Sequence, residues 1–501
     1  MDFDRDLVSV QEVRNLIQQS KAAQEEYSTW DQKRVDSLIK VITEECEKNS
    51  ERLAKMAVEE TGFGIWQDKV LKNALGSTMT YEYIKDMKTV GIISEDKEKG
   101  IIEIGVPMGI VAALIPSTNP TSTVMYKSLI CLKAGNSIII SPHPNAFNSI
   151  VETVKVINTA LDRCNAPKGL VQVITTPTSQ GRDTLLKDRR IGIILATGGE
   201  AMVRAAYSSG NPALGVGPGN GPSFIERSAD IKTAIHHIFD SKTFDNGTIC
   251  ASEQSIVTEK CIAEQVIAEA ERQGGYFLSD QQSEKVGKFI LRENGTMNPN
   301  IVGRSAKYIA EMAGITIPEG TRVLISRQTT VGKNNPYSRE KLCPILAFYV
   351  EDDWEKACQR CVAILNNEGV GHTMTLHTQN DEVVREFALK KPVSRLLVNT
   401  AGSLGGTGAT TSLPPALTLG CGAVGGSATS DNVTPMNLIN IRRVAYGKLE
   451  LSDLRKGNPA PDNSYTADSY QQRQYSSAGS SITSEDIEAI TRAVIARLNN
   501  K

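Results

Sequence analysis

The sequence predicts an α/β fold in which a doubly wound parallel sheet is joined to a second α/β domain and a small β arm. From residue 109 onward, short apolar runs alternate with helical stretches, a pattern typical of a parallel sheet covered on both faces. The chain has 501 residues, more than one ordinary core accommodates, so two or three domains are expected. Small and polar residues follow several of the apolar runs, and open α/β sheets bind ligands beyond the carboxyl ends of their strands.

Composition and charge exclude several classes of partner. The formal net charge is −2, which gives no electrostatic reason to expect nucleic acid or an anionic membrane. No run approaches the ~18 apolar residues of a membrane span. Residues 1–6 lack the basic and then apolar profile of a secretory signal, so we expect a cytoplasmic location.

The nine cysteines are scattered along the chain, which predicts reduced thiols instead of a disulfide framework. Cys358 and Cys361 form a CxxC, but they fall inside a predicted helix, and no second cysteine pair or histidine pair accompanies them. We therefore predict no metal site.

Before the sheet, the spacing of apolar residues predicts helices over residues 8–50 and 52–88. Residues 88–105 alternate apolar and charged side chains around a polar turn, which predicts an exposed hairpin. This hairpin is either a plain surface feature or an arm that contacts another subunit, and the sequence does not decide between them.

The first sheet is predicted from five short apolar strands and the helices between them. The strands are expected at residues 110–115, 137–140, 170–174, 191–195 and 223–225, and the helices near 121–133, 145–162, 179–188 and 200–208.

Two of the loops that follow these strands carry groups suited to a nucleotide. Pro116, Ser117, Thr118 and Asn119 open one helix, and the Asn119 amide can donate a hydrogen bond to an oxyanion. The second loop, residues 197–199, reads Thr-Gly-Gly and opens another helix, where a pyrophosphate can rest on free amides. Ordinary helix capping and turn chemistry is the alternative for each loop alone. Their occurrence at two strand ends of one sheet favours a nucleotide site.

A glycine-rich run at residues 215–222 does not fit a dinucleotide fingerprint, because it precedes a strand instead of linking a strand to a helix. We interpret it as close backbone packing at a domain junction.

Cys250 is the candidate nucleophile. It ends a small polar loop and leads directly into the predicted strand 254–258, so a rigid element holds the thiol while loop amides stay free to face a reacting atom. A buried structural cysteine is the alternative. His372, near the start of another predicted strand, either tunes this thiol, contacts a second substrate or is structural.

The second α/β unit continues to about residue 430 and ends in glycine-rich segments. Helices are expected near 259–273 and 352–366, and strands near 345–350, 373–377, 395–399 and 437–445. Glycines within residues 401–408 and 419–426 are expected to let backbone pack closely around Cys250.

The chain ends in two segments of different composition. Residues 451–481 are rich in polar residues and proline and predict a flexible linker. Residues 482–501 begin with a capping signal and place Ile487, Ile490, Val494 and Leu498 on one helical stripe. Such a helix either packs on its own domain or docks into a groove on another protein.

Together these motifs resemble the coenzyme A-acylating branch of the aldehyde dehydrogenase superfamily, over about residues 8–450. The segments that carry the resemblance are 115–123, 248–254, 419–422 and 437–441. The resemblance implies an aldehyde dehydrogenase-like fold, Cys250 as the nucleophile and Asn119 as the oxyanion amide. It also implies NAD held by Pro116, Ser117 and Thr118, by the turn of Thr197, Gly198 and Gly199, and by Glu340, which matches a glutamate on the nicotinamide ribose. An ordinary surface glutamate is the alternative for Glu340.

Two departures from the family pattern bear on the reaction. Hydrolytic members carry a glutamate base in the segment that matches residues 215–222, and this chain has no carboxylate there. Without a base for water, a Cys250 thioester is expected to survive until coenzyme A takes the acyl group. The loop at residues 141–144 also lacks the lysine and glutamate that grip the adenosine ribose in many relatives, so NADP is not excluded.

The predicted function is reversible oxidation of a small aliphatic aldehyde to acyl-CoA with NAD. The alternatives are a hydrolytic aldehyde dehydrogenase with a base such as Glu253, a glutamyl-phosphate-reductase-like enzyme, and a non-catalytic cargo or scaffold protein. We assign residues 1–235 to NAD binding, 236–430 to catalysis, and 431–450 to a returning strand used in oligomerisation as a homodimer or homotetramer. Residues 482–501 resemble the peptides that direct enzymes into bacterial microcompartments, which implies a shell protein or other cargo as partner.

Overall fold

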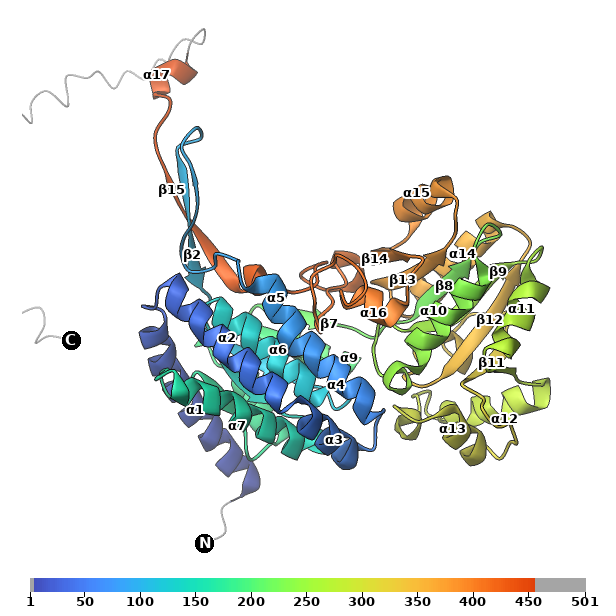
Figure 1. Cartoon of the computed structure of the whole chain (residues 1–501). Helices are drawn as coiled ribbons and strands as arrows, with labels where there is room; N and C mark the ends of the chain where they lie inside the picture. The colour runs from blue at the N-terminus through green and yellow to red at the C-terminus, as the bar shows by residue number, and fades with distance from the viewer. Residues whose placement is uncertain (1–3, 456–501) are drawn as a thin grey trace, which may run out of the picture. The chain divides into compact units, whose positions relative to one another are not determined.

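The computed structural model describes residues 4–455 of the chain (Figure 1). Residues up to Val444 form one compact unit, and Ala445 begins a second, whose described part contains the short helix α17 (Leu451–Leu454). The predicted peptide at residues 482–501 and most of the predicted linker lie outside the described residues. Within the described range, no helix combines the length and apolar character needed to cross a membrane.

The first sheet has five parallel strands in the order β5-β4-β3-β6-β7. These strands are β3 (Ile110–Leu114), β4 (Ser137–Ser141), β5 (Val171–Val173), β6 (Ile191–Thr197) and β7 (Ala213–Val216). Alternate side chains of β3 enter two different cores. Val111 and Ala113 face the core that includes Leu129 of helix α6 (Pro120–Lys133) and Ile157 of helix α7 (Phe147–Arg163). Ala112 faces the core that includes Val13 of helix α1 (Arg5–Tyr27). The sheet is therefore covered on both faces, as predicted.

The order of the strands places the ligand edge of this sheet. The chain leaves β3 for β4 and β5 on one side and then returns to β6 on the other side of β3. Ligands bind at such a switch point, beyond the carboxyl ends of the strands. Asn119 lies in the loop that follows β3, and Thr197 is the last residue of β6, just ahead of Gly198 and Gly199.

The second sheet has seven parallel strands in the order β10-β11-β12-β9-β8-β13-β14. They are β8 (Gly221–Ile225), β9 (Glu253–Glu259), β10 (Gly275–Phe277), β11 (Val323–Arg327), β12 (Ile345–Glu351), β13 (Gly371–His377) and β14 (Val393–Val398). The sequence grouped residues 223–225 with the first sheet, and this was wrong: β8 pairs with β9 and β13. The change of sheet comes between β7 and β8, ahead of the predicted boundary at residue 235. An apolar run alone does not reveal which neighbour a strand pairs with.

The N-terminal region is divided into more helices than predicted. They are α1 (Arg5–Tyr27), α2 (Gln32–Lys48), α3 (Ser50–Thr61), α4 (Trp66–Ala74), a π-helical turn (Leu75–Met79) and α5 (Thr80–Ile84). Asp31 caps α2 by accepting a hydrogen bond from the Arg34 amide, and Gly62 ends α3 in a left-handed conformation with φ +66°. The apolar pattern continues through Asp31 and Gly62, so the sequence predicted longer helices than the structure has.

The remaining helices connect or cover the strands. They are α6 (Pro120–Lys133), α7 (Phe147–Arg163), α8 (Ser179–Lys187), α9 (Glu200–Tyr207), α10 (Ile231–Thr243), α11 (Ala263–Arg272), α12 (Asp280–Ile290), α13 (Ala306–Met312), α14 (Trp354–Asn367), α15 (Asp381–Lys390) and α16 (Gly402–Gly406). Cys358 and Cys361 are both buried on α14.

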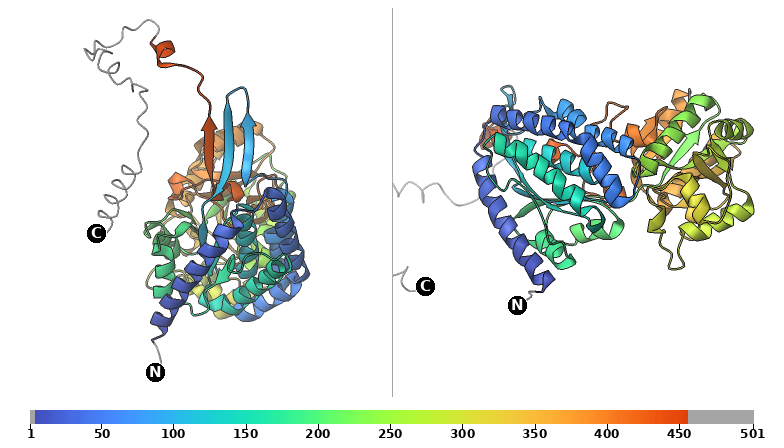
Figure 2. Two further views of the ribbon diagram at one scale, coloured as in Figure 1. Left: turned by 90° about the vertical axis from the view of Figure 1, so that its left-hand side faces the viewer. Right: turned by 60° about the horizontal axis from the view of Figure 1, so that its bottom comes forward.

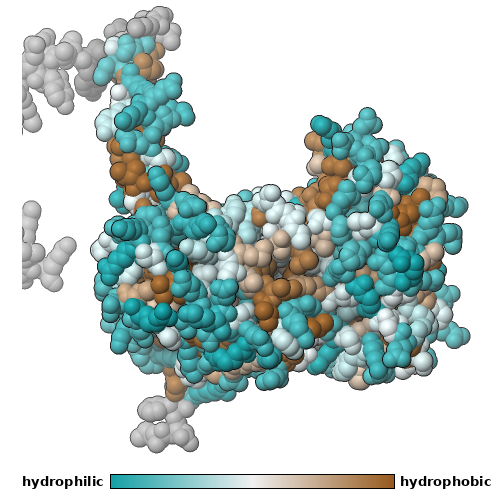
Figure 3. All heavy atoms as spheres, viewed as in Figure 1, coloured by the Kyte–Doolittle hydropathy of each residue, from teal (hydrophilic) through white to brown (hydrophobic). Residues whose placement is uncertain are grey.

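The predicted hairpin is confirmed and forms part of a small sheet. Strands β1 (Gly91–Asp96) and β2 (Ile101–Pro107) pair antiparallel, and β15 (Ile439–Ala445) lies beside β2 (Figure 2, left). Ile92 and Val444 on this arm are exposed hydrophobic residues, and hydrophobic side chains show on its surface (Figure 3).

Candidate active site

A cavity of about 230 Å³ lies where the carboxyl edge of the first sheet meets the loop that carries Cys250. It is lined by nine of the predicted site residues: Pro116, Ser117, Thr118, Asn119, Thr197, Gly198, Gly199, Cys250 and Glu340. The structure therefore brings together residues that lie up to 224 positions apart in the chain, between Pro116 and Glu340. Their individual roles remain predictions.

Cys250 sits just before β9, at the amino end of the strand, as predicted. The segment 215–222 packs against its backbone: a Cβ atom on Gly219 would lie 1.9 Å from the Cys250 carbonyl oxygen. Burial raises the pKa of the Cys250 thiol to about 12, and Glu340 and Cys421 act in the same direction, while Arg395 opposes them. The described structure therefore holds a neutral thiol at this position.

His372 contacts this thiol. Its Nε2 atom lies 3.1 Å from the Cys250 Sγ atom, and its Nδ1 atom lies 2.9 Å from the Thr373 hydroxyl. Burial lowers the pKa of His372 to about 3, and the nearby Arg395 guanidinium adds to the effect. The sequence left open whether His372 is structural, and the contact places a neutral imidazole against the candidate nucleophile.

Arg395 supports the wall behind this pair and was not found from the sequence. Its guanidinium donates to the carbonyl oxygens of His372 at 3.1 Å and Gly420 at 2.6 Å, and to the Thr373 hydroxyl at 3.2 Å. Arg395 lies on β14 and is buried, which is rare for arginine unless it is paired in this way. A single arginine in a strand pattern gives no sequence signal for such a role.

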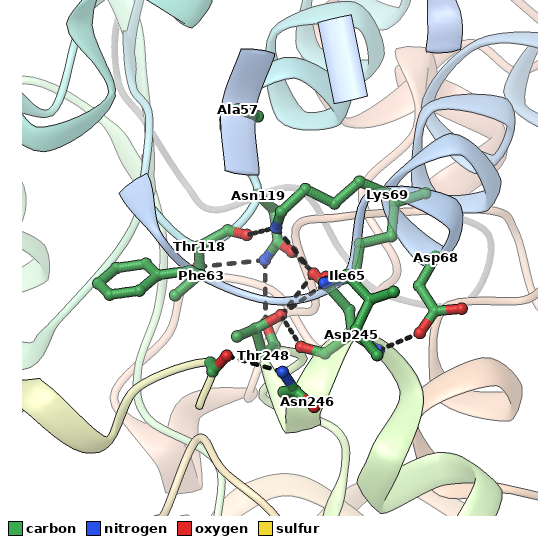
Figure 4. A network of polar contacts seen from close by, with 12 residues as sticks. Ala57, Phe63, Ile65, Asp68, Lys69, Thr118, Asn119, Asp245, Asn246 and Thr248 are labelled. Carbon is green, nitrogen blue, oxygen red and sulfur yellow. Dashed lines mark hydrogen bonds and ion pairs between the residues drawn. The ribbon is translucent and has the colours of Figure 1, made fainter. Parts of the chain in front are cut away.

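Asn119 precedes α6 and presents its amide at the cavity. The Oδ1 atom accepts a hydrogen bond from Lys72 Nζ at 2.6 Å. The Nδ2 atom donates to the Thr248 carbonyl and the Thr118 hydroxyl, each at 3.2 Å (Figure 4). Both Nδ2 contacts are at the long limit of ordinary hydrogen bonds. The amide is oriented with its oxygen toward Lys72 and its nitrogen toward the loop of Cys250.

A buried charge cluster lies behind Asn119, and sequence reasoning missed it. Lys69 and Lys72 of α4 both contact the Asp245 carboxylate, at 2.9 and 2.5 Å. All three side chains are at most 2% exposed. A spacing of three residues on a helix puts the two lysines on one face, but nothing in the sequence shows that this face is buried.

Glu340 lies in the cavity wall and is not an ordinary surface glutamate. Its carboxylate accepts a hydrogen bond from the Gly219 amide at 2.8 Å. Burial, with the nearby Glu368, raises the pKa of Glu340 to about 8. Among the described residues that line the cavity, Glu340 has the one carboxylate, and near neutral pH it is mainly protonated.

Glu253, the base considered for a hydrolytic enzyme, does not line this cavity. Its side chain is buried, and its Oε1 atom accepts a hydrogen bond from the Gly402 amide at 2.7 Å. Burial raises the pKa of Glu253 to about 7.

The helix N-termini at the cavity fit a phosphate-bearing cofactor. Asn119 and Gly199 stand at the starts of α6 and α9. The Asn119 side chain does not cap α6, and Gly199 has no side chain with which to cap α9. First-turn amides without caps are donors for an anion. A Cβ atom on Gly199 would meet nothing within 4 Å, so this turn faces open space.

Comparison with known proteins shows which family this chain is similar to. Residues 6–412 match the model of the aldehyde dehydrogenase family. The crystal structure of a probable aldehyde dehydrogenase from Listeria monocytogenes is 60% identical, with a TM-score of 0.90 over 90% of this chain and 100% of that chain. The structure of an acetylating aldehyde dehydrogenase from Geobacillus thermoglucosidasius is 48% identical, with a TM-score of 0.88 over 89% of this chain and 99% of that chain.

Curated relatives agree with this assignment. A bifunctional aldehyde-alcohol dehydrogenase of Escherichia coli is 43% identical over 444 residues, which are 88% of this chain and 50% of that protein. The chain thus spans about half the length of the first curated relatives it matches. By the extent of the family match and the identity to these proteins, the chain belongs to the aldehyde dehydrogenase family.

Proposed function

We propose that this chain oxidises a small aliphatic aldehyde to acyl-CoA with NAD, through a thioester on Cys250. One observation carries the proposal: Cys250, whose sulfur lies 3.1 Å from Nε2 of His372, lines a cavity whose one carboxylate among the described residues, Glu340, accepts a hydrogen bond from the Gly219 amide. Residues 215–222, where hydrolytic relatives carry a glutamate base, have no carboxylate, so water lacks that base. The similarity to an acetylating aldehyde dehydrogenase supports the same branch.

The first step forms a bond between the Cys250 sulfur and the aldehyde carbon. The thiol proton passes to Nε2 of His372, 3.1 Å away, as the sulfur attacks. The oxygen of the hemithioacetal becomes negative, and the Asn119 amide and the Cys250 backbone N–H stabilise it. For this, one Asn119 hydrogen exchanges its 3.2 Å contact for the oxyanion.

NAD, when bound, supplies the acceptor for the hydride that leaves the hemithioacetal carbon. The residues proposed to hold it are Pro116, Ser117 and Thr118, the amides of Thr197, Gly198 and Gly199, and Glu340. The choice between NAD and NADP stays open, because residues 141–144 lack the lysine and glutamate with which many relatives hold the adenosine ribose.

The second step transfers the acyl group. The thiol of coenzyme A attacks the thioester carbon, the carbon–sulfur bond to Cys250 breaks, and acyl-CoA leaves. His372 first releases to solvent the proton it took from Cys250; it then takes the incoming thiol's proton and passes it to the Cys250 sulfur as that sulfur leaves. Apolar side chains such as Ile249, Leu417 and Leu419 line part of the cavity, which suits an uncharged aldehyde of a few carbons.

The test is a reaction with aldehyde and NAD, with and without coenzyme A. We expect NADH and acyl-CoA only in its presence, and a series of aldehyde chain lengths then defines the substrate. Equal NADH without coenzyme A, with free acid as product, would establish the hydrolytic alternative. No turnover with any aldehyde would favour the cargo or scaffold alternative.

Assembly and location complete the proposal. Exposed Ile92 and Val444 support a role for the arm of β1, β2 and β15 in a homodimer or homotetramer, which light scattering would measure. The terminal segment 482–501 is proposed to direct the enzyme into a bacterial microcompartment by binding a shell protein or other cargo. Fusing it to a fluorescent protein in cells that make such compartments tests this.

A further inference from the structure

We infer that Lys72 is a positioning residue that fixes the Asn119 amide for the oxyanion, and that Asp245 holds Lys72 in place. The inference rests on the proposed function, in which Asn119 donates to the hemithioacetal oxygen. It adds two residues that do not touch the substrate and act through Asn119. Figure 4 shows the Asp245 carboxylate close to Lys69, Asn119 and Thr248.

The contact with Lys72 determines which way round the Asn119 amide lies. Lys72 Nζ has hydrogens to donate and no acceptor, so it pairs with the Asn119 oxygen at 2.6 Å. Turning the amide over would place its NH2 group against an ammonium and lose this bond. A hydrogen bond from a cation is stronger than a neutral one, and it polarises the amide so that its N–H groups become better donors. Both effects favour donation from Nδ2 into the cavity.

Lys72 is itself held at several points. Its Nζ atom lies 2.5 Å from Asp245 Oδ2 and 2.8 Å from the Thr248 hydroxyl. Thr248 is two residues before Cys250, and its carbonyl accepts from Asn119. The ammonium therefore ties the oxyanion amide to the loop of the nucleophile.

Asp245 is placed by the backbone around it. It has a left-handed conformation with φ +49°, and its own amide donates to Asp68 at 2.7 Å. Its Oδ1 atom accepts from the Ile65 amide at 2.7 Å, and a Cβ atom on Gly64 would lie 1.8 Å from the same oxygen. A non-glycine residue in this conformation is uncommon and persists where its surroundings impose it.

The charge balance argues that Lys72 is not needed merely to neutralise Asp245. Lys69 contacts the same carboxylate at 2.9 Å, so Asp245 has a cationic partner without Lys72, and the half-buried Asp68 carboxylate lies near both lysines. Burying a second ammonium is costly for folding, and one cation would suffice to pair the carboxylate. Of the two, Lys72 reaches the Asn119 amide, whereas Lys69 donates to the Thr118 carbonyl.

A double-mutant cycle on the full chain tests the inference. The variants are Lys72→Met, Asn119→Ala and their combination, assayed by coenzyme A-dependent NADH formation. We expect Lys72→Met to lower kcat by about 10- to 10²-fold in the wild-type background, as for loss of a charge-assisted hydrogen bond, with little change in the KM for NAD. In the Asn119→Ala background it should lower kcat by less than about 3-fold, since the group it positions is gone.

Lys69→Met is the matched control. It removes an equally buried ammonium from the same carboxylate but leaves the bond between Lys72 and Asn119. Its effect on kcat should multiply with that of Asn119→Ala. If Lys72→Met also multiplies fully with Asn119→Ala, Lys72 is structural and the inference is overturned.

Two measurements keep the outcome interpretable. Thermal unfolding checks that the Lys72→Met variant folds. If that variant does not fold, Lys72→Gln takes its place in the cycle. A Lys72→Gln variant that lowers kcat equally in both Asn119 backgrounds also overturns the inference. Wild-type turnover is measured first. Its absence contradicts the proposed function, whereas normal wild-type turnover with a multiplicative cycle contradicts the positioning role alone.

Discussion

The Nε2 atom of His372 lies 3.1 Å from the Sγ atom of Cys250, and the strand and loop that carry them are 122 residues apart in the chain. Burial disfavours charge on both partners, raising the pKa of the thiol to about 12 and lowering that of the imidazole to about 3. The pair therefore keeps its proton on sulfur until a reaction draws it away. This makes proton transfer within the pair part of the attack on the aldehyde.

Replacing His372 tests that transfer. We expect His372→Asn to lower kcat for acyl-CoA formation by about 10²- to 10⁴-fold, the usual contribution of general acid–base catalysis. The asparagine keeps a polar side chain next to Thr373 but cannot take a proton. A variant with wild-type kcat would mean that His372 is structural.

The reactivity of Cys250 toward iodoacetamide should follow from its raised pKa. Alkylation requires the thiolate, so in the protein without substrate the rate should keep rising from pH 7 to pH 10. An ordinary thiol, with a pKa of about 8.5, would reach a plateau near the upper end of this range. Mass spectrometry of the labelled peptide measures the rate at Cys250 itself. A plateau below pH 8 would show a thiolate stabilised in the free enzyme.

Removing the amide of Asn119 should greatly lower kcat without unfolding the protein. Loss of one oxyanion donor typically lowers kcat by about 10²- to 10³-fold, so we expect this from Asn119→Ala. The side chain also accepts from buried Lys72, which then lacks one acceptor, so a modest fall in the melting temperature should accompany the change. Unaltered kcat would remove Asn119 from the reaction.

The sequence identified the parts of this site that reside in loops after strands. Asn119 follows β3 and Thr197 ends β6, and parallel strands bring their carboxyl ends to one edge of the sheet. Cys250 precedes β9 of the second sheet, so the apolar run locates its loop but not its place beside the first sheet. The sequence could not show that Lys72 and Asp245 meet, because their contact depends on how α4 packs against a loop 173 residues away. The sequence also misplaced β8 in the first sheet, because tertiary packing decides which strands are neighbours.

The pH dependence of stability should reveal the protonated state of Glu340. Its pKa is about 8 in the folded protein and near 4.5 when exposed, so between these values the folded state holds a proton that the unfolded state releases. Unfolding free energy from this group therefore falls as the pH rises from about 4.5 to 8. Glu340→Gln should remove this fall, so that the variant gains stability relative to wild type as the pH rises. Parallel curves for the two proteins in urea unfolding would contradict the raised pKa.

The terminal segment and the cavity should be separable functions. Within residues 4–455, the residues that line the cavity lie between Pro116 and Leu419, and the compact unit that contains them ends at Val444. Deleting residues 456–501 removes none of these lining residues, so coenzyme A-dependent kcat should stay within about 2-fold of the full chain. Full-length Cys250→Ser is the converse variant: we expect no acyl transfer but normal binding of NAD and normal localisation in cells. Turnover by Cys250→Ser would contradict the assignment of Cys250 as the nucleophile. Loss of turnover on deletion would contradict the independence of the catalytic unit from residues 456–501. If the deletion alters only localisation, the chain is an enzyme with a separate targeting segment and not a scaffold.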